Sequence, residues 1–341
     1  MGRGEIACDV PPAYRARWER AYRASALQSL VQRDSLSGAT DTLAKAGIQA
    51  VVLKGAWLAY HAYPHPAERP MRDLDLLVAQ DDLIRAYHVL KEAGWDGPDA
   101  GDDELARIGF AHNHLPPLRS PEGVMLELHG KLWAAGDRAA GPMPRGIEQE
   151  VLAQPMTNDG IAYPRPGHML AHLCVHAVYS HGLNVGPLLL SDIDYLLREH
   201  IIDWTTFRRN AEANGYASGA AIVLALVDRW RRPGLLHDSG FAQPLSKGGL
   251  NGLSLLLCQD MRYRQDVVLG GNLLSGWRAN GLSGLIGAAR RSFHRDMRDS
   301  IGGTLAKSRS MRFVEVTRAA LRHDIWRSAG RRAQLDRMLG N

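Results

Sequence analysis

The strongest limit on how this chain folds comes from two aspartates in and beside a short apolar run. One aspartate lies within the run, and the other directly precedes it. Residues 74–78 read Leu-Asp-Leu-Leu-Val, and a run of this length and composition is typical of a buried strand. Side chains two apart on a strand point to the same face, so Asp73 and Asp75 should lie side by side at one end of a sheet. Two carboxylates this close repel each other unless a cation or a proton lies between them. Hard oxygen ligands of this kind suit Mg²⁺.

A second Asp-x-Asp pair, Asp192 and Asp194, serves as an internal control. Its leucine-rich surroundings, 188–190 and 195–197, favour a helix. Residues two apart on a helix lie about 200° apart around the axis. We therefore expect no metal site at this pair.

The stretch upstream of Asp73 predicts a phosphate-binding turn. Residues 48–53 form an apolar, β-branched run that ends at Lys54-Gly55, and residues 56–60 look helical. The first turn of a helix presents free N–H groups and the positive end of the helix dipole, which together favour phosphate. Lys54 adds a positive charge at the same place. We therefore expect Lys54 and Gly55 to bind the phosphates of a nucleotide.

A third carboxylate follows on another predicted strand. Residues 123–129 should form this strand, with residues 110–118 as its hairpin partner and Glu127 and His129 on one face. Three carboxylates on adjacent strands can hold two Mg²⁺ ions. Two such ions can bind a triphosphate, activate an attacking oxygen and neutralise the leaving pyrophosphate.

These motifs together resemble the DNA polymerase β-like nucleotidyltransferase superfamily, and more closely its bacterial group of uncharacterised nucleotidyltransferase family proteins. The similarity spans roughly residues 40–230 and rests on three motifs: Leu53-Lys54-Gly55, Arg69-x-x-x-Asp73-Leu-Asp75 and Glu127-Leu-His129. We expect an α+β fold, with a small mixed β-sheet core and flanking helices followed by a mostly α-helical C-terminal domain. The resemblance implies two sets of site residues. The catalytic metal ligands are Asp73, Asp75 and Glu127, and the nucleotide-binding residues are Lys54, Gly55, Arg69 and His129.

The activity that the resemblance implies is Mg²⁺-dependent transfer of a nucleoside monophosphate from a nucleoside triphosphate, with ATP as the expected nucleotide. Pyrophosphate would leave, and the acceptor stays open among a small molecule, a peptide, a protein and an RNA end. The chain departs from the family at Lys54-Gly55, where the superfamily usually has Gly-Ser, and at Gly186-Pro-Leu-Leu, where an arginine-rich stretch is common. The second departure motivates an alternative, a non-catalytic nucleotide-binding sensor or scaffold. A further alternative is an antitoxin-like protein that nucleotidylates a partner.

Several histidines invite a metal interpretation that their spacing does not support. His168, His172 and His176 share a helix face, but no Glu stands beside the first histidine as a zinc metalloprotease motif requires. We interpret them as polar packing residues. His112 and His114 should share the face of a strand near His129.

Length and composition fit a two-domain protein of ordinary globular type. The chain has 341 residues, of which 45% are hydrophobic and 23% charged. We expect a helical segment over 1–46, the catalytic core over 47–155 and a helical domain over 156–341, with a Gly- and Pro-rich linker at 136–166 and a loop at 231–254. No apolar run is long enough for a membrane span, the start of the chain lacks a signal-peptide core, and three scattered cysteines fit reduced thiols. These features predict a cytoplasmic location.

The C-terminal tail is basic. From Arg290 onward, thirteen Lys and Arg residues stand against five Asp and Glu residues. Such a tail can bind an acidic or macromolecular partner. The simpler interpretation is the solvated face of amphipathic terminal helices.

Overall fold

The computed structural model describes residues 11–133, 143–259, parts of 270–287 and 323–340. The chain forms two compact units. Unit 1 draws its described residues from Met1–Leu132, Gly146–His172 and Tyr195–Ile202, and unit 2 from Trp133–Arg145, Leu173–Asp194 and Asp203–Asn341. The domain bounds expected from the sequence stay a prediction.

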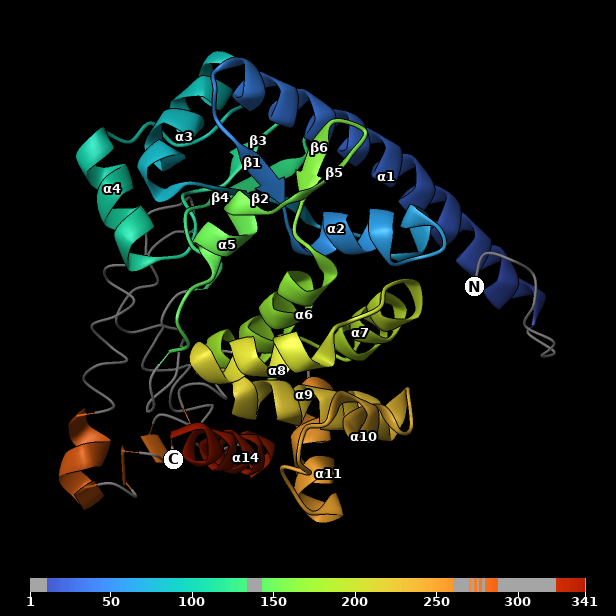
Figure 1. Cartoon of the computed structure of the whole chain (residues 1–341), viewed down its shortest axis with the longest axis vertical. Coiled ribbons are helices and arrows are strands. Elements are labelled where there is room, and N and C mark those ends of the chain that lie inside the picture. Colours follow the sequence, from blue (N-terminus) through green and yellow to red (C-terminus); the bar gives the residue numbers. More distant parts are fainter. Residues whose placement is uncertain are drawn as a thin grey trace. The chain divides into compact units, whose positions relative to one another are not determined.

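Unit 1 is built on a six-stranded mixed sheet with the order β3-β4-β2-β1-β6-β5 (Figure 1). The central strands β1 and β2 are antiparallel, β2 and β4 are parallel, and β1 and β6 are parallel. The edge strands β3 and β5 pair antiparallel with β4 and β6. The strand bounds are β1 Ala50–Val52, β2 Asp73–Val78, β3 Leu118–Arg119, β4 Met125–His129, β5 Met156–Asn158 and β6 Ile161–Tyr163. The small mixed sheet confirms the core expected from the sequence.

The register between β2 and β4 separates an apolar face of the sheet from an acidic one. Asp75 pairs with Glu127 and Leu77 with His129, so these side chains share a face. The alternate residues of both strands form the opposite face and are fully buried or nearly so: Leu74, Leu76, Leu126 and Leu128. Burial of this apolar face fixes the register, because a shift by one residue would turn the acids inward.

Helices flank the sheet of unit 1. The helices are α1 (Pro12–Lys45), α2 (Lys54–His61), α3 (Leu83–Glu92), α4 (Asp102–Ala111) and α5 (Glu148–Ala153), with 3₁₀ turns at Pro66–Glu68 and Gln80–Asp82. Figure 1 shows the C-terminal end of α1 beside α3, and the two helices are in contact. In this half of α1, Leu36, Ala39 and Leu43 recur at helical spacing and are completely buried.

Two local expectations in unit 1 are wrong. Phe110 lies in α4 and not in a hairpin, because three acidic residues in the first turn, 102–104, favour a helix start there. Only residues 118–119 pair with β4, and His114 adds an isolated bridge to His129. Residues 156–163, expected in a linker, form the β5–β6 hairpin. Its turn, Asp159-Gly160, has positive φ at both positions, as a two-residue hairpin turn requires.

The regular secondary structure of unit 2 is helical throughout its described residues. A π-helical turn spans His176–Ser180, and the further helices are α8 (Trp204–Ala213), α9 (Ala217–Trp230), α10 (Leu235–Ser239), α11 (Lys247–Leu257) and α14 (His323–Gly340). The division between the units falls within α6 (Pro166–Val175) and α7 (Leu188–Glu199). Every residue of α9 from Gly219 to Val227 is buried, which marks α9 as the central helix of this unit. The loop expected at 231–254 is wrong, since α10 and the start of α11 lie there.

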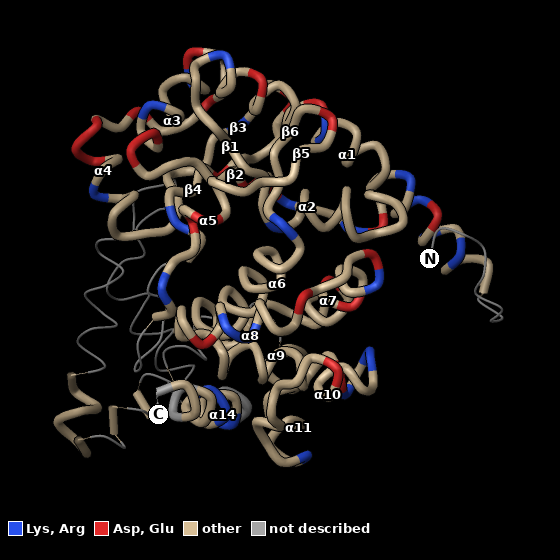
Figure 2. The backbone as a smooth tube through the Cα atoms, in the orientation of Figure 1, with Lys and Arg blue, Asp and Glu red and all other residues tan. Residues whose placement is uncertain are grey.

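The basic tail is described only in α14, whose arginines are marked in Figure 2. Arg332 of this helix is buried, and its Nη1 donates a hydrogen bond to the carbonyl of His181. At least this arginine therefore serves packing within unit 2. Residues 290–322 and Asn341 of the tail lie outside the described residues, and the expected partner of the tail stays a prediction. Within the described part of the chain, no helix is both long enough and apolar enough to cross a membrane.

Candidate active site

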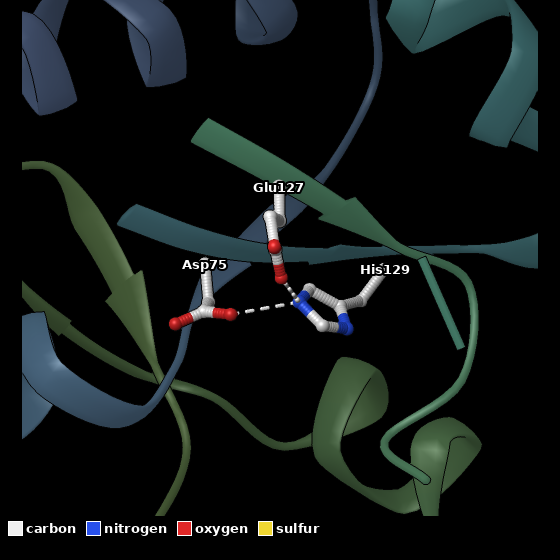
Figure 3. Close-up of side chains that lie close together, drawn as sticks. All are labelled: Asp75, Glu127 and His129. Carbon is white, nitrogen blue, oxygen red and sulfur yellow. Dashed lines mark hydrogen bonds and ion pairs between the residues drawn. The ribbon is translucent and has the colours of Figure 1, made fainter. Parts of the chain in front are cut away.

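The acidic face of the sheet brings Asp75 and Glu127 together on neighbouring strands. Figure 3 shows both carboxylates directed toward the Nε2 atom of His129. Asp75 is 3% exposed and His129 is completely buried, whereas Glu127 is partly exposed. Asp73, the first residue of β2, lies on the same face as Asp75 and is partly exposed. The structure thus gathers the three expected metal ligands on one face of adjacent strands.

Lys54 reaches this group from the start of α2. Its Nζ atom lies 2.6 Å from Oδ1 of Asp75, and the side chain keeps 20% of its surface exposed. The backbone N–H of Leu53 donates to the carbonyl of Asp75, which joins the end of β1 to β2 at this point. Lys54 has a φ of 46°, a left-handed conformation that costs a non-glycine residue about 1–2 kcal/mol. Strain of this kind persists where the surrounding structure imposes it, often at functional sites.

His129 orients the Asp75 carboxylate. The side-chain amide of Asn113, whose Nδ2 can only donate, lies 3.3 Å from Nδ1 of His129. Nε2 carries a proton, because it faces carboxylate oxygens that can only accept a hydrogen bond. Nε2 lies 2.8 Å from Oδ1 of Asp75 and 3.6 Å from Oε2 of Glu127. The N–H thus donates to Asp75, and one carboxylate oxygen accepts from both Lys54 and His129.

These contacts keep Asp75 and Lys54 charged. Burial opposes ionisation of Asp75, but the Lys54 ammonium and the hydrogen bond from His129 hold the pKa of the carboxyl well below its usual range. Burial likewise opposes the charge on Lys54, but the attraction of Asp75 outweighs it and raises the pKa of the ammonium above its usual value. Asp75 and Lys54 therefore form a buried ion pair.

The site holds more negative charge than Lys54 balances. Burial, followed by the charges of Asp75 and Glu127, raises the pKa of Asp73 to about 6. For Glu127, burial raises the pKa, but the hydrogen bond from His129 and the nearby His114 outweigh it, and the pKa is lowered. His114 Nε2 lies 3.8 Å from Oε2 of Glu127. The carboxylates of Asp75 and Glu127 repel the charged form of Asp73, and a bound cation would relieve this repulsion.

The residues present fit a divalent cation. Asp75, Glu127 and His129 offer ligand atoms within 4.8 Å of one another, and no other such group of three or more occurs among the described residues. Carboxylate oxygens are the ligands that Mg²⁺ prefers. His129 carries its proton on the atom that faces the carboxylates, so it acts as a donor that orients a ligand. Asp73, Asp75 and Glu127 would hold the ion.

Arg69 and the second Asp-x-Asp pair make other contacts in the structure. Arg69 precedes β2, and its Nη1 donates to the carbonyl of Pro70. Asp192 and Asp194 are buried in α7, a helix as expected, and Asp194 accepts a 3.5 Å contact from Arg231.

The three histidines at 168, 172 and 176 belong to no metal-binding group among the described residues. His168 lies 3.9 Å from Glu150, and His176 lies 3.0 Å from His181, Nε2 to Nε2. His172 is buried, and burial, with the positive charge of Lys54, lowers its pKa to about 3. His172 is therefore neutral at physiological pH.

Sequence reasoning missed two features of the site. Asn113 was not singled out, although an amide between two histidines just before a strand edge is a usable signal. The ion pair between Lys54 and Asp75 had no local signal at all, because it joins residues 21 positions apart.

The comparison with protein families agrees with this geometry. A family model described as "Uncharacterised nucleotidyltransferase" matches residues 4–232, which is more than half of the chain and includes all the site residues above. No curated protein matches the chain. The chain therefore belongs to this family of uncharacterised nucleotidyltransferases.

Proposed function

We propose that this protein transfers a nucleoside monophosphate from a nucleoside triphosphate to an acceptor nucleophile, in a reaction that depends on Mg²⁺ and releases pyrophosphate. ATP is the nucleotide we expect. The observation that carries the proposal is the convergence of Asp73, Asp75 and Glu127 on one sheet face, beside a lysine at the start of a helix. Membership of the family supports nucleotidyl transfer in general.

The residues of the site divide between ion and nucleotide. Asp73, Asp75 and Glu127 would hold the ion, and His129 would keep Asp75 in place through its N–H. Among the described residues, no side chain caps α2, so its first N–H groups would bind phosphate oxygens at Gly55. Arg69, just before β2, would add a bidentate phosphate contact.

The reaction is a substitution at the α-phosphorus. The acceptor oxygen forms a bond to this phosphorus, and the bond between the α-phosphorus and the bridging oxygen of pyrophosphate breaks. When bound, the ion supplies positive charge that lowers the pKa of the acceptor and stabilises the leaving group. Glu127 is ionised at neutral pH and would help to activate the acceptor oxygen.

We place the activity in the cytoplasm, where nucleoside triphosphates are abundant. Cys174 and Cys258 are free thiols, which suits a reducing compartment.

The test is to find what the protein labels. Cell extract is incubated with the purified chain, Mg²⁺ and ATP, CTP, GTP or UTP labelled at the α-phosphate. We expect one labelled product that disappears with the double variant Asp73→Asn/Asp75→Asn and persists with Asp81→Asn. Asp81 is the matched control, because it is an exposed carboxylate just after the same strand.

Two results would contradict the proposal. Full labelling by the double variant would show that Asp73 and Asp75 are not needed for the reaction. Binding of nucleotide without turnover against extract and a panel of small acceptors would favour a sensor or scaffold.

A further inference from the structure

We propose that the ammonium group of Lys54 takes the place of one of the two cations expected at this site, so that one divalent ion per chain serves the reaction. The inference rests on the proposed function and concerns how its site is built. It replaces the sequence-based expectation of two Mg²⁺ ions.

The first argument is the occupancy of the Asp75 carboxylate. A carboxylate that bridges two metal ions in the common arrangement uses one oxygen for each ion. In this structure, Oδ1 of Asp75 accepts from Lys54 Nζ at 2.6 Å and from His129 Nε2 at 2.8 Å. Only Oδ2 is left as a ligand, so Asp75 can bind one ion while Lys54 stays in place.

The second argument is charge. The site contains three carboxylates, Asp73, Asp75 and Glu127, and one ammonium group. The ammonium neutralises one carboxylate, and a single divalent ion neutralises the other two. A lysine ammonium is a compact point charge, which makes it a closer substitute for a metal ion than an arginine would be.

The third argument is the remaining donor capacity of Lys54. An ammonium has three N–H donors; the hydrogen bond to Asp75 uses one, and Nε2 of His129 lies 3.5 Å from the nitrogen. The side chain lies at the uncapped start of α2 and keeps 20% of its surface exposed. Lys54 can therefore join Asp75 to a nucleotide phosphate, which is the connection that a nucleotide-bound metal ion would otherwise make.

The backbone holds Lys54 in this position. Its left-handed φ of 46° is maintained although lysine pays a steric cost there. Gly55 follows in close contact with Met71, since an added Cβ would lie 3.1 Å from Met71 Cγ. The turn is thus packed closely on the residues that lead into β2.

The experiment counts bound ions. Mn²⁺ is titrated into the full chain with a non-hydrolysable ATP analogue at the protein concentration, and free Mn²⁺ is measured by electron paramagnetic resonance. We expect one ion per chain for the wild type and two for Lys54→Met, which has a similar length and no charge. Lys54→Gln is a second neutral variant in case the first does not fold, and circular dichroism checks the fold of each.

Lys91→Met is the matched control: Lys91, on α3, pairs with Asp99 in the loop that follows, and its loss should leave one ion. Two ions in the wild type would overturn the inference and leave the proposed function standing. One ion in both neutral Lys54 variants would also overturn it. Mn²⁺ binding no tighter in any form than to the free analogue without protein would reject the metal-dependent function itself, so the two failures are distinguishable.

Discussion

Removal of the Lys54 charge should destabilise unit 1 when no divalent ion is present. In Lys54→Met, the carboxylate of Asp75 stays 3% exposed and loses its ion-pair partner. Removing one partner of a buried ion pair costs about 3–5 kcal/mol. We expect the lower value, about 3 kcal/mol, because Lys54 is partly exposed and His129 still donates to Asp75.

The assay is differential scanning calorimetry in buffer with a chelator, repeated with Mg²⁺. For a unit of this size, a loss of about 3 kcal/mol corresponds to a fall in Tm of roughly 6–12 °C. Mg²⁺ should raise the Tm of Lys54→Met more than that of the wild type, because the ion restores positive charge beside Asp75. The double variant Lys54→Met/Asp75→Asn should regain most of the loss, since no buried charge is left unpaired.

Two results would refute this reasoning. If Lys54→Met loses less than about 0.5 kcal/mol, a value typical of an exposed pair, then Lys54 and Asp75 do not form a buried ion pair in solution. A double variant no more stable than Lys54→Met would likewise show that the two residues are not coupled.

Three further predictions follow from other contacts. Burial lowers the pKa of His61 to about 4, so between pH 6.5 and pH 4 the unfolded chain binds a proton that the folded chain does not. The free energy of unfolding should therefore decrease as the pH is lowered, by about 2 kcal/mol at pH 5. Urea unfolding of His61→Gln at pH 7.5 and pH 5 should lack this loss. Glu127→Gln should lower the rate of nucleotide transfer by about 10²–10⁴-fold in a pyrophosphate-release assay, while the exposed Glu122→Gln on the same hairpin keeps the wild-type rate. Gly55→Ala should cost about 1 kcal/mol by thermal denaturation, because its Cβ would crowd Met71, and an unchanged Tm would contradict the close packing.

The local elements around the site could be predicted because their signals are local. The apolar run at 74–78 has the length and composition of a buried strand, and the structure has β2 over Asp73–Val78. The helix expected after Lys54-Gly55 is α2, and Asp192 and Asp194 lie on a helix as their neighbours indicated. The α+β fold with its small mixed sheet was expected from the resemblance to the nucleotidyltransferase superfamily, and the structure confirms it.

The errors arose where an element is very short or its partner is distant. Strand β3 has two residues, which is too few for an alternating pattern. The strand predicted over residues 110–118 was therefore too long. The β5–β6 hairpin has three residues in each strand, and its Asp159-Gly160 turn was a signal that the Pro- and Gly-rich composition obscured. Residues 235–239 and 247–257 are helical despite their glycines and serines, because burial of leucines on one face outweighs a low local propensity.

The sequence by itself determined which carboxylates could meet, since the two-residue repeat of a strand puts Asp73 beside Asp75 and Glu127 beside His129 on single faces. Tertiary structure alone decided that β2 and β4 pair in parallel with Asp75 opposite Glu127, and that Lys54 and His129 share one oxygen of Asp75. These contacts join residues 21 and 54 positions apart. No local pattern encodes such a contact, because burial of the leucine face sets the register, and the register then brings the charges together.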